Sequence, residues 1–131
     1  MLGELAKGAS QRMVICDLEG GINTLFRVRE GFLEAVLVVC EPTVKSIETT
    51  ARVLAMCDRL AFEVVILGNR LRDAADELLI TERFPGRRFV AIPEDVGIAE
   101  ADRRGEAPID HAPDGPGVMA ITALAHSLLG R

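Results

Sequence analysis

Residues 63–69 read E-V-V-I-L-G-N, a run of four large aliphatic side chains that ends in a glycine and an asparagine. A strand with one solvent-exposed face would carry a polar residue at every second position, and this run does not. Continuous Val, Ile and Leu are typical of a central strand in a parallel sheet, where helices cover both faces. The stretch therefore predicts an α/β fold.

Three further runs have the same aliphatic character. They read M-V-I-C-D at 13–17, E-A-V-L-V-V-C-E at 34–41 and R-F-V-A-I-P at 88–93. Helical patterns separate the runs, and parallel strands require such crossovers. We therefore expect a parallel sheet of about four strands with flanking helices.

Four segments have the residue spacing of amphipathic helices. Thr43 is a candidate N-cap for a helix whose apolar face is formed by Val44, Ile47, Ala51 and Leu54. Two more helices are expected at 72–83 and at 96–104, the second closed by Gly105. The last is expected at about 118–129, after a Pro/Gly-rich loop at 107–117, with an apolar face of Val118, Ile121, Ala125 and Leu128.

Length and composition restrict the class of protein. The 131 residues suit a single α/β domain, 1–131, and the core must be aliphatic because the chain has no Trp or Tyr. The net charge is −5, and no basic tail or stripe is present. This argues against nucleic acid as the main partner.

The cysteines and the hydropathy pattern bear on the cellular compartment. Cys16, Cys40 and Cys57 are odd in number and far apart, which argues against a disulfide framework and against a zinc site. Buried thiols in a reducing cytoplasm are the expectation. No apolar run is long enough to span a membrane, and the N-terminus does not have the pattern of a secretory signal.

The candidate site consists of residues that directly follow the predicted strands, because ligands of open parallel sheets bind outside the carboxyl ends of the strands. The carboxylate of Asp17 could hold Mg²⁺. Gly20 and Gly21 would let backbone N–H groups approach a phosphate closely. Asn69 could read the edge of an adenine ring. The alternative is structural: Asp17 marks an ordinary strand-to-loop transition, and Asn69 merely ends a strand.

Five motifs occur in a fixed order along the chain. They are D-L-E-G-G (17–21), E-P-T-V-K-S-I-E-T-T-A-R-V-L (41–54), V-I-L-G-N-R (65–70), I-P-E-D-V-G-I-A-E-A-D-R-R-G (92–105) and D-G-P-G-V-M-A-I-T-A-L-A (114–125). With these motifs the chain resembles, over about residues 10–129, the C-terminal two-thirds of the MinD/ParA-type P-loop ATPases. The first two are most similar to the carbon monoxide dehydrogenase maturation factor branch, CooC.

The resemblance implies a site for ATP and Mg²⁺. Asp17 would be the Walker-B-like catalytic acid that holds the Mg²⁺ shell, and Gly20 with Gly21 would sense the γ-phosphate. These roles would make the chain the C-terminal portion of a P-loop NTPase fold.

The resemblance also implies a base pocket. Asn69 would contact adenine, and Pro93 with Asp95 would line the pocket. The Asn69-Arg70-Leu71-Arg72 stretch has no aspartate at its fourth position, where guanine-binding N-K-x-D motifs need one. Adenine is therefore favoured over guanine.

One element of the family is missing. The chain contains no G-K-[ST] motif, and its only lysines are Lys7 and Lys45. Without the phosphate loop, weak or absent ATP binding is expected for this chain alone, and ATPase activity is expected only if a longer chain or a partner supplies the loop. A partner chain that carries the loop would complete the site, and a homodimer or a partner chain would also cover the sheet edge that a missing first strand leaves unpaired. The alternative is a degenerate, non-catalytic paralogue that acts as a regulatory or protein-interaction module.

Overall fold

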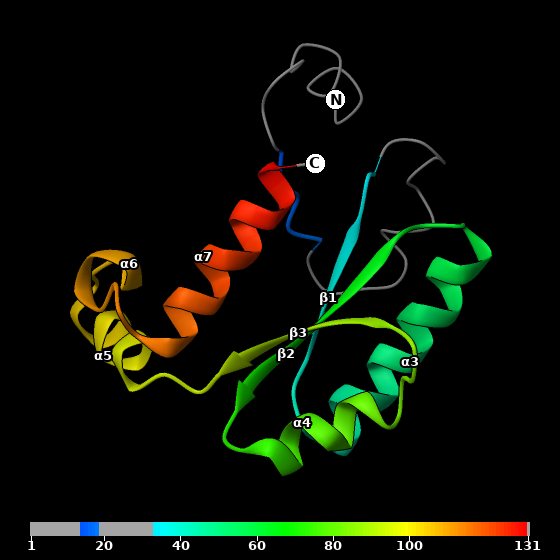
Figure 1. Ribbon diagram of the computed structural model, residues 1–131, viewed down its shortest axis with the longest axis horizontal. Helices are drawn as coiled ribbons and strands as arrows, with labels where there is room; N and C mark the ends of the chain where they lie inside the picture. Colours follow the sequence, from blue (N-terminus) through cyan, green and yellow to red (C-terminus); the bar gives the residue numbers. More distant parts are fainter. Residues whose placement is uncertain (1–13, 19–32, 131) are drawn as a thin grey trace.

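The computed structural model describes residues 14–18 and 33–130, in which strands alternate with helices (Figure 1). The elements are β1 (Val36–Cys40), α3 (Val44–Arg59), β2 (Val64–Leu71), α4 (Ala74–Thr81), β3 (Arg88–Pro93), α5 (Val96–Arg104), α6 (Pro108–His111) and α7 (Pro116–Leu129).

The strands form a parallel sheet in the order β1-β2-β3. The central strand, β2, pairs on both sides: Ile66 lies opposite Val38 of β1 and opposite Phe89 of β3. The predicted α/β class and the parallel direction of the strands are confirmed.

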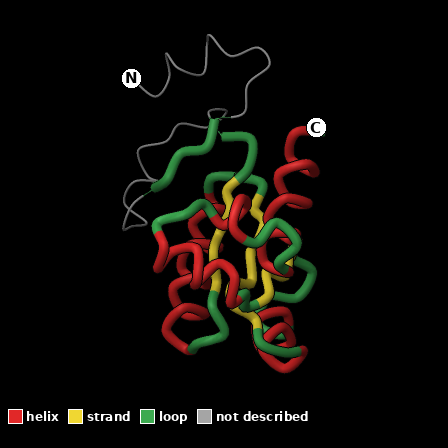
Figure 2. Tube along the Cα trace, turned by 90° about the vertical axis from the view of Figure 1, so that its left-hand side faces the viewer, coloured by secondary structure: helices red, strands yellow, loops and turns green. Residues whose placement is uncertain are grey.

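Helices cover both faces of the sheet (Figures 1 and 2). On one face α3 packs against β1 and α4 against β2, and the buried side chains include Val38, Ile66 and Ile80. On the other face α7 packs against β3, and Leu124 meets Val65 of the central strand. The continuous aliphatic run of β2 thus supplies both hydrophobic cores with alternate residues.

The sheet has three strands in the described part of the chain, not four. Residues 14–18, which make up most of the first predicted strand, have no strand conformation, and Met13 lies outside the described residues. Ile15 is 77% exposed, and Val14 is exposed as well. An apolar run forms a central strand only where helices cover both faces and neighbours pair with it; Val14 and Ile15 are exposed, and no strand among the described residues pairs with residues 14–18.

The helix predictions are confirmed in part. The observed bounds of α5 match the prediction, Gly105 closes it with a φ of +66°, and Thr43 caps α3 by accepting a hydrogen bond from the Ser46 N–H. α4 begins later than predicted because Asp73 caps it, and it ends at Thr81, before the predicted position 83. A short helix, α6, lies inside the predicted 107–117 loop, where Pro108 occupies its first turn.

The predicted apolar helix faces contain errors. In α3, Ile47 and Leu54 are buried but Val44, in the first turn, is exposed. In α7, Ile121 is exposed, while Leu124 is buried. α7 is apolar on nearly all sides, so its residue spacing did not identify the face that contacts the sheet.

One part of the sheet is left uncovered. Val39 pairs with Leu67, so both side chains point to the face that α7 covers. Leu67 is 6% exposed, whereas Val39 is 56% exposed. Among the described residues β1 also pairs with β2 alone, so its other edge is free.

The described residues contain two fully buried thiols, Cys40 and Cys57, and one half-buried thiol, Cys16. This agrees with the expectation of buried cysteines at the first two positions. No described helix has both the length and the apolar character that a membrane span requires.

Ile80 anchors α4, since it is the large apolar side chain of this helix that is fully buried. We expect Ile80→Ala to lower the free energy of unfolding by about 3 kcal/mol, because the truncation leaves a cavity in the core. Leu79→Ala, on the exposed side of the same helix, is the matched control and should cost about 0.5 kcal/mol. Urea denaturation measures both. Equal losses would show that α4 does not dock through Ile80.

Candidate functional site

The carboxyl ends of the three strands lie at one edge of the sheet because the strands are parallel. β1 is followed there by Glu41, β2 ends with Asn69, Arg70 and Leu71, and β3 ends with Pro93. Leu71 pairs with Pro93, and Asn69 pairs with the residue before it, so Asn69 and Pro93 lie on neighbouring strands.

A β-bulge shapes the end of β2. Asn69 and Leu71 have partners on β3, but Arg70 between them has none. Arg70 has a φ of +58°, in the left-handed region. The extra residue reverses the alternation of side chains, so Leu71 is buried in the first core together with Ile66. The bulge therefore closes the core and leaves Arg70 exposed at the edge.

The side chain of Asn69 is half-buried and available for a ligand. Within the described residues its amide group forms no hydrogen bond, whereas its backbone belongs to the β2 ladder. Beyond Pro93 the chain is tied back to β2, because the Glu94 N–H donates to the Leu71 carbonyl over 2.9 Å. The amide of Asn69 and the ring of Pro93 thus sit on a firmly connected pair of strand ends.

The Asp95 carboxylate joins two helices. Its Oδ1 accepts a hydrogen bond from the Gly97 N–H at the start of α5, over 2.8 Å. Its Oδ2 accepts from the N–H groups of Gly117 and Val118 at the start of α7, over 2.9 and 3.4 Å. Partial burial acts to raise the pKa of this carboxyl, but the backbone N–H donors prevail and hold the pKa of Asp95 below its usual range.

The D-G-P-G motif at 114–117 is explained by this contact. A Cβ on Gly117 would lie 2.9 Å from the Cβ of Asp95, and a Cβ on Gly115 would overlap the Oδ2 of Asp95. Glycine lets the start of α7 approach the carboxylate. Both Asp95 oxygens are therefore occupied by the protein, and Asp95 could contribute to a base pocket only by fixing its walls.

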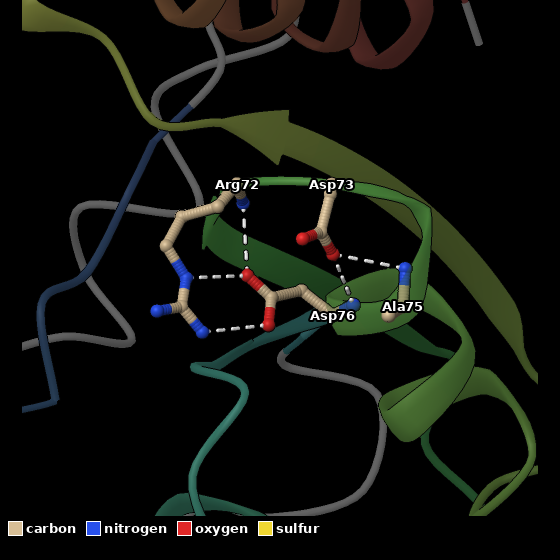
Figure 3. Close-up of polar contacts among 4 residues, drawn as sticks. All are labelled: Arg72, Asp73, Ala75 and Asp76. Atoms are coloured by element: carbon tan, nitrogen blue, oxygen red, sulfur yellow. Dashed lines mark hydrogen bonds and ion pairs between the residues drawn. The ribbon is translucent and has the colours of Figure 1, made fainter.

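A second carboxylate, that of Asp76, connects the end of β2 to the start of α4 (Figure 3). Asp76 is buried and accepts three hydrogen bonds from Arg72: from the backbone N–H over 2.9 Å, from Nε over 2.8 Å and from Nη2 over 2.9 Å. Asp73 caps α4 by accepting from the N–H groups of Ala75 and Asp76, each over 3.0 Å. The guanidinium of Arg72 and then its backbone N–H lower the pKa of Asp76 to about 2.

The remaining predicted site residues belong to the N-terminal part of the chain. Asp17 is exposed, and within residues 14–18 and 33–130 it forms no hydrogen bond or ion pair. Because residues 14–18 form no strand, Asp17 does not end a strand of this sheet. Gly20 and Gly21 lie outside the described residues. The structure thus brings Asn69, Pro93 and Asp95 to one edge.

Sequence reasoning placed Arg70 among the residues that follow the 63–69 run but gave it no role, and it missed the pairing of Arg72 with Asp76. The Asp73-Ala-Ala-Asp76 spacing signals a helix start, but it does not reveal that Asp76 turns back onto Arg72. A Gly-Asn pair inside an aliphatic run is a known sign of a bulge, and it could have drawn attention to Arg70.

Comparison with known proteins gives a distant relative. No family model matches the chain. Over 96 residues the chain is 24% identical to an uncharacterized ATP-binding protein of Methanocaldococcus jannaschii. The match covers 73% of this chain and 39% of that protein, so the chain spans well under half the length of its relative.

The depressed pKa of Asp76 predicts a pH-dependent contribution to stability. An unfolded aspartate titrates at about 3.9, and folded Asp76 titrates at about 2, so its contribution is complete above about pH 4 and is lost as the pH falls towards 2. Asp76→Asn should therefore melt lower than the wild type at pH 7, and the difference should shrink on acidification. Thermal melts by circular dichroism measure it, with exposed Asp102→Asn as the control. A difference that does not change with pH would contradict the pairing.

Asp17 should contribute little to folding. Since it is exposed and has no partner in the described residues, Asp17→Asn should change the free energy of unfolding by less than about 1 kcal/mol. A buried and paired aspartate would lose about 3–5 kcal/mol. Thermal melts of the two proteins distinguish these cases, and a fall of many degrees would contradict a role for Asp17 as a free ligand.

Proposed function

We propose that this chain is part of an ATP-binding α/β protein and supplies the adenine side of the site. The observation that carries the proposal is the half-buried amide of Asn69, which lacks a partner in the described residues and lies beside Pro93 at the carboxyl edge. The similarity to an ATP-binding protein of M. jannaschii supports adenine as the base.

The edge offers chemistry that suits adenine. An amide can accept a hydrogen bond from the exocyclic amino group of the base and donate one to a ring nitrogen. Pro93 presents an apolar ring on the neighbouring strand, and Asp95 keeps the following segment in place through its bonds to α5 and α7. The Asn69-Arg70-Leu71-Arg72 sequence has no carboxylate at the position that would select guanine.

The phosphate side would be completed by Mg²⁺ and by a loop that the chain does not contain. The exposed carboxylate of Asp17 would give Mg²⁺ one hard oxygen ligand, and waters and phosphate oxygens would supply the others. The Mg²⁺ ion would neutralise phosphate charge. Gly20 and Gly21 are proposed to approach the terminal phosphate, as in the MinD/ParA-type and CooC-like ATPases that the chain resembles.

A longer chain or a partner chain of different sequence would supply the phosphate loop. The free edge of β1 and the exposed side chain of Val39 next to it are where an additional strand and its helix would pack. ATP hydrolysis would then require this complement, and the chain alone would turn over ATP no faster than background.

A second candidate is a non-catalytic interaction module. The uncovered Val39 and the exposed Met119 and Ile121 of α7 favour it, since an exposed apolar surface often marks a protein interface. The two functions differ in one property: the module needs no affinity for adenine.

The test is nucleotide titration followed by NMR, which detects weak binding. We expect wild-type protein to bind ATP with a Kd near 1 mM, because the contacts of the base leave the triphosphate charge almost unmet. Asn69→Ala should weaken binding of ATP and of adenosine about tenfold, the value of one lost hydrogen-bonding group. Arg83→Ala, beyond the opposite end of α4, is the control.

Two results would contradict the proposal. Equal affinity of the Asn69→Ala and wild-type proteins for adenosine would remove Asn69 from the site. Absence of any binding of adenosine to the wild type would favour the interaction module instead.

A further inference from the structure

The backbone of Arg70 is held in a conformation that arginine rarely adopts. Its φ of +58° lies in the left-handed region, where glycine and asparagine are the usual residues. Ala61, with a φ of +54°, is the other non-glycine residue of this kind in the described part of the chain. Ala61 follows the end of α3, a common place for a left-handed residue, whereas Arg70 interrupts a strand.

The packing of the core does not require an arginine at this position. The bulge needs one extra residue so that Leu71 enters the core, and glycine would supply it with less strain. The side chain of Arg70 is 66% exposed, so its burial does not offset the backbone strain either. Strain that the fold does not need is a feature of binding sites.

The guanidinium of Arg70 is held more weakly than that of its neighbour Arg72. Arg72 gives its Nε and Nη2 donors to Asp76. Arg70 has one ion pair within the described residues, with Nη1 lying 3.7 Å from Oε1 of Glu41, and both side chains are exposed. Such a pair contributes little to stability. The geometry also shows that the guanidinium reaches from the end of β2 to the end of β1.

We propose that Arg70 binds phosphate oxygens of the ligand at the carboxyl edge, and that the Glu41 carboxylate occupies it in the free protein. The flat, two-pronged donor set of a guanidinium matches phosphate oxygens better than an ammonium group does. The inference rests on the proposed function in one respect: the phosphate is taken to belong to the nucleotide whose base contacts Asn69. It goes beyond that function by assigning a phosphate contact to this chain itself.

The first test separates strain from binding. Arg70→Gly should raise Tm by roughly 2–5 °C, because glycine adopts the left-handed conformation freely. The same variant should bind inorganic pyrophosphate about tenfold more weakly, the cost of one charge-assisted contact. Ala61→Gly is the matched control: it should also raise Tm but leave pyrophosphate affinity unchanged. NMR titration of the full chain measures affinity, and thermal melts measure Tm.

The second test uses the competing carboxylate. Glu41→Gln should strengthen pyrophosphate binding severalfold, because it removes both the internal competitor and a repulsive negative charge. Arg70→Lys should recover part of the affinity that Arg70→Gly loses, since the charge returns without the two-pronged geometry.

The outcomes distinguish this inference from the proposed function. Equal pyrophosphate affinity of wild type and Arg70→Gly would overturn the role of Arg70, even if adenosine still binds through Asn69. Loss of pyrophosphate binding in Arg70→Gly without any adenosine binding by the wild type would support Arg70 and refute the adenine site. Failure of the wild type to bind pyrophosphate at all would overturn the inference.

Discussion

The structure depends on the burial of β2 between two layers of helices. This strand pairs with β1 and β3, and its residues alternate between a core under α3 and α4 and a core under α7. The apolar run of β2 ends at Gly68. Glycine is needed there because a Cβ would lie 2.5 Å from the ring of Phe89. The bulge that follows shifts the alternation by one residue, so that Leu71 completes the first core.

The same shift produces the candidate site. In a regular strand of the same sequence, without the bulge, Leu71 would point to the α7 face and Arg70 would point to the first core. With the bulge, Asn69 and Arg70 lie at the open edge of the sheet and the strand end is still anchored by a buried leucine. After β3, the Asp95 carboxylate anchors the chain in a similar way, because it accepts hydrogen bonds from the starts of α5 and α7. The polar edge therefore rests on two rigid attachments, which is what a binding site needs for preorganisation.

The sequence predicted the elements whose signals are local. The bounds of β3 and α5 match because Pro93, Asp95 and Gly105 mark their ends with specific backbone chemistry. Thr43 is correct for the same reason. The predicted face of α7 was right at Val118 and Leu128, which are buried or pack against the second core, but wrong at Ile121. A helix that is apolar on most sides presents several faces of similar hydrophobicity, and only contact with the sheet selects Leu124 over Ile121.

The parts of the site that depend on non-local geometry were not predictable. Asn69, Pro93 and Asp95 follow apolar runs, so the rule for parallel sheets located them. The sequence did not show that the Asp95 carboxylate accepts a hydrogen bond from the Gly117 N–H at the start of α7, because the two residues are 22 positions apart. The strand predicted at 13–17 is not observed at residues 14–17 for a related reason. A central strand with this apolar pattern must be covered on both faces, and the described residues do not cover Val14 and Ile15.

Two departures from local rules lie next to each other at the carboxyl edge. Elsewhere the caps and the buried aliphatic side chains agree with one another, and no described buried polar side-chain atom lacks a hydrogen bond. At the carboxyl edge, by contrast, an arginine has left-handed backbone and an amide has no partner in the described residues. The bulge at Arg70 places Leu71 in the first core, but an arginine in the left-handed region costs strain that glycine would avoid. Since Asn69 and Arg70 are adjacent, a single ligand that hydrogen-bonds the amide and carries negative charge would contact both.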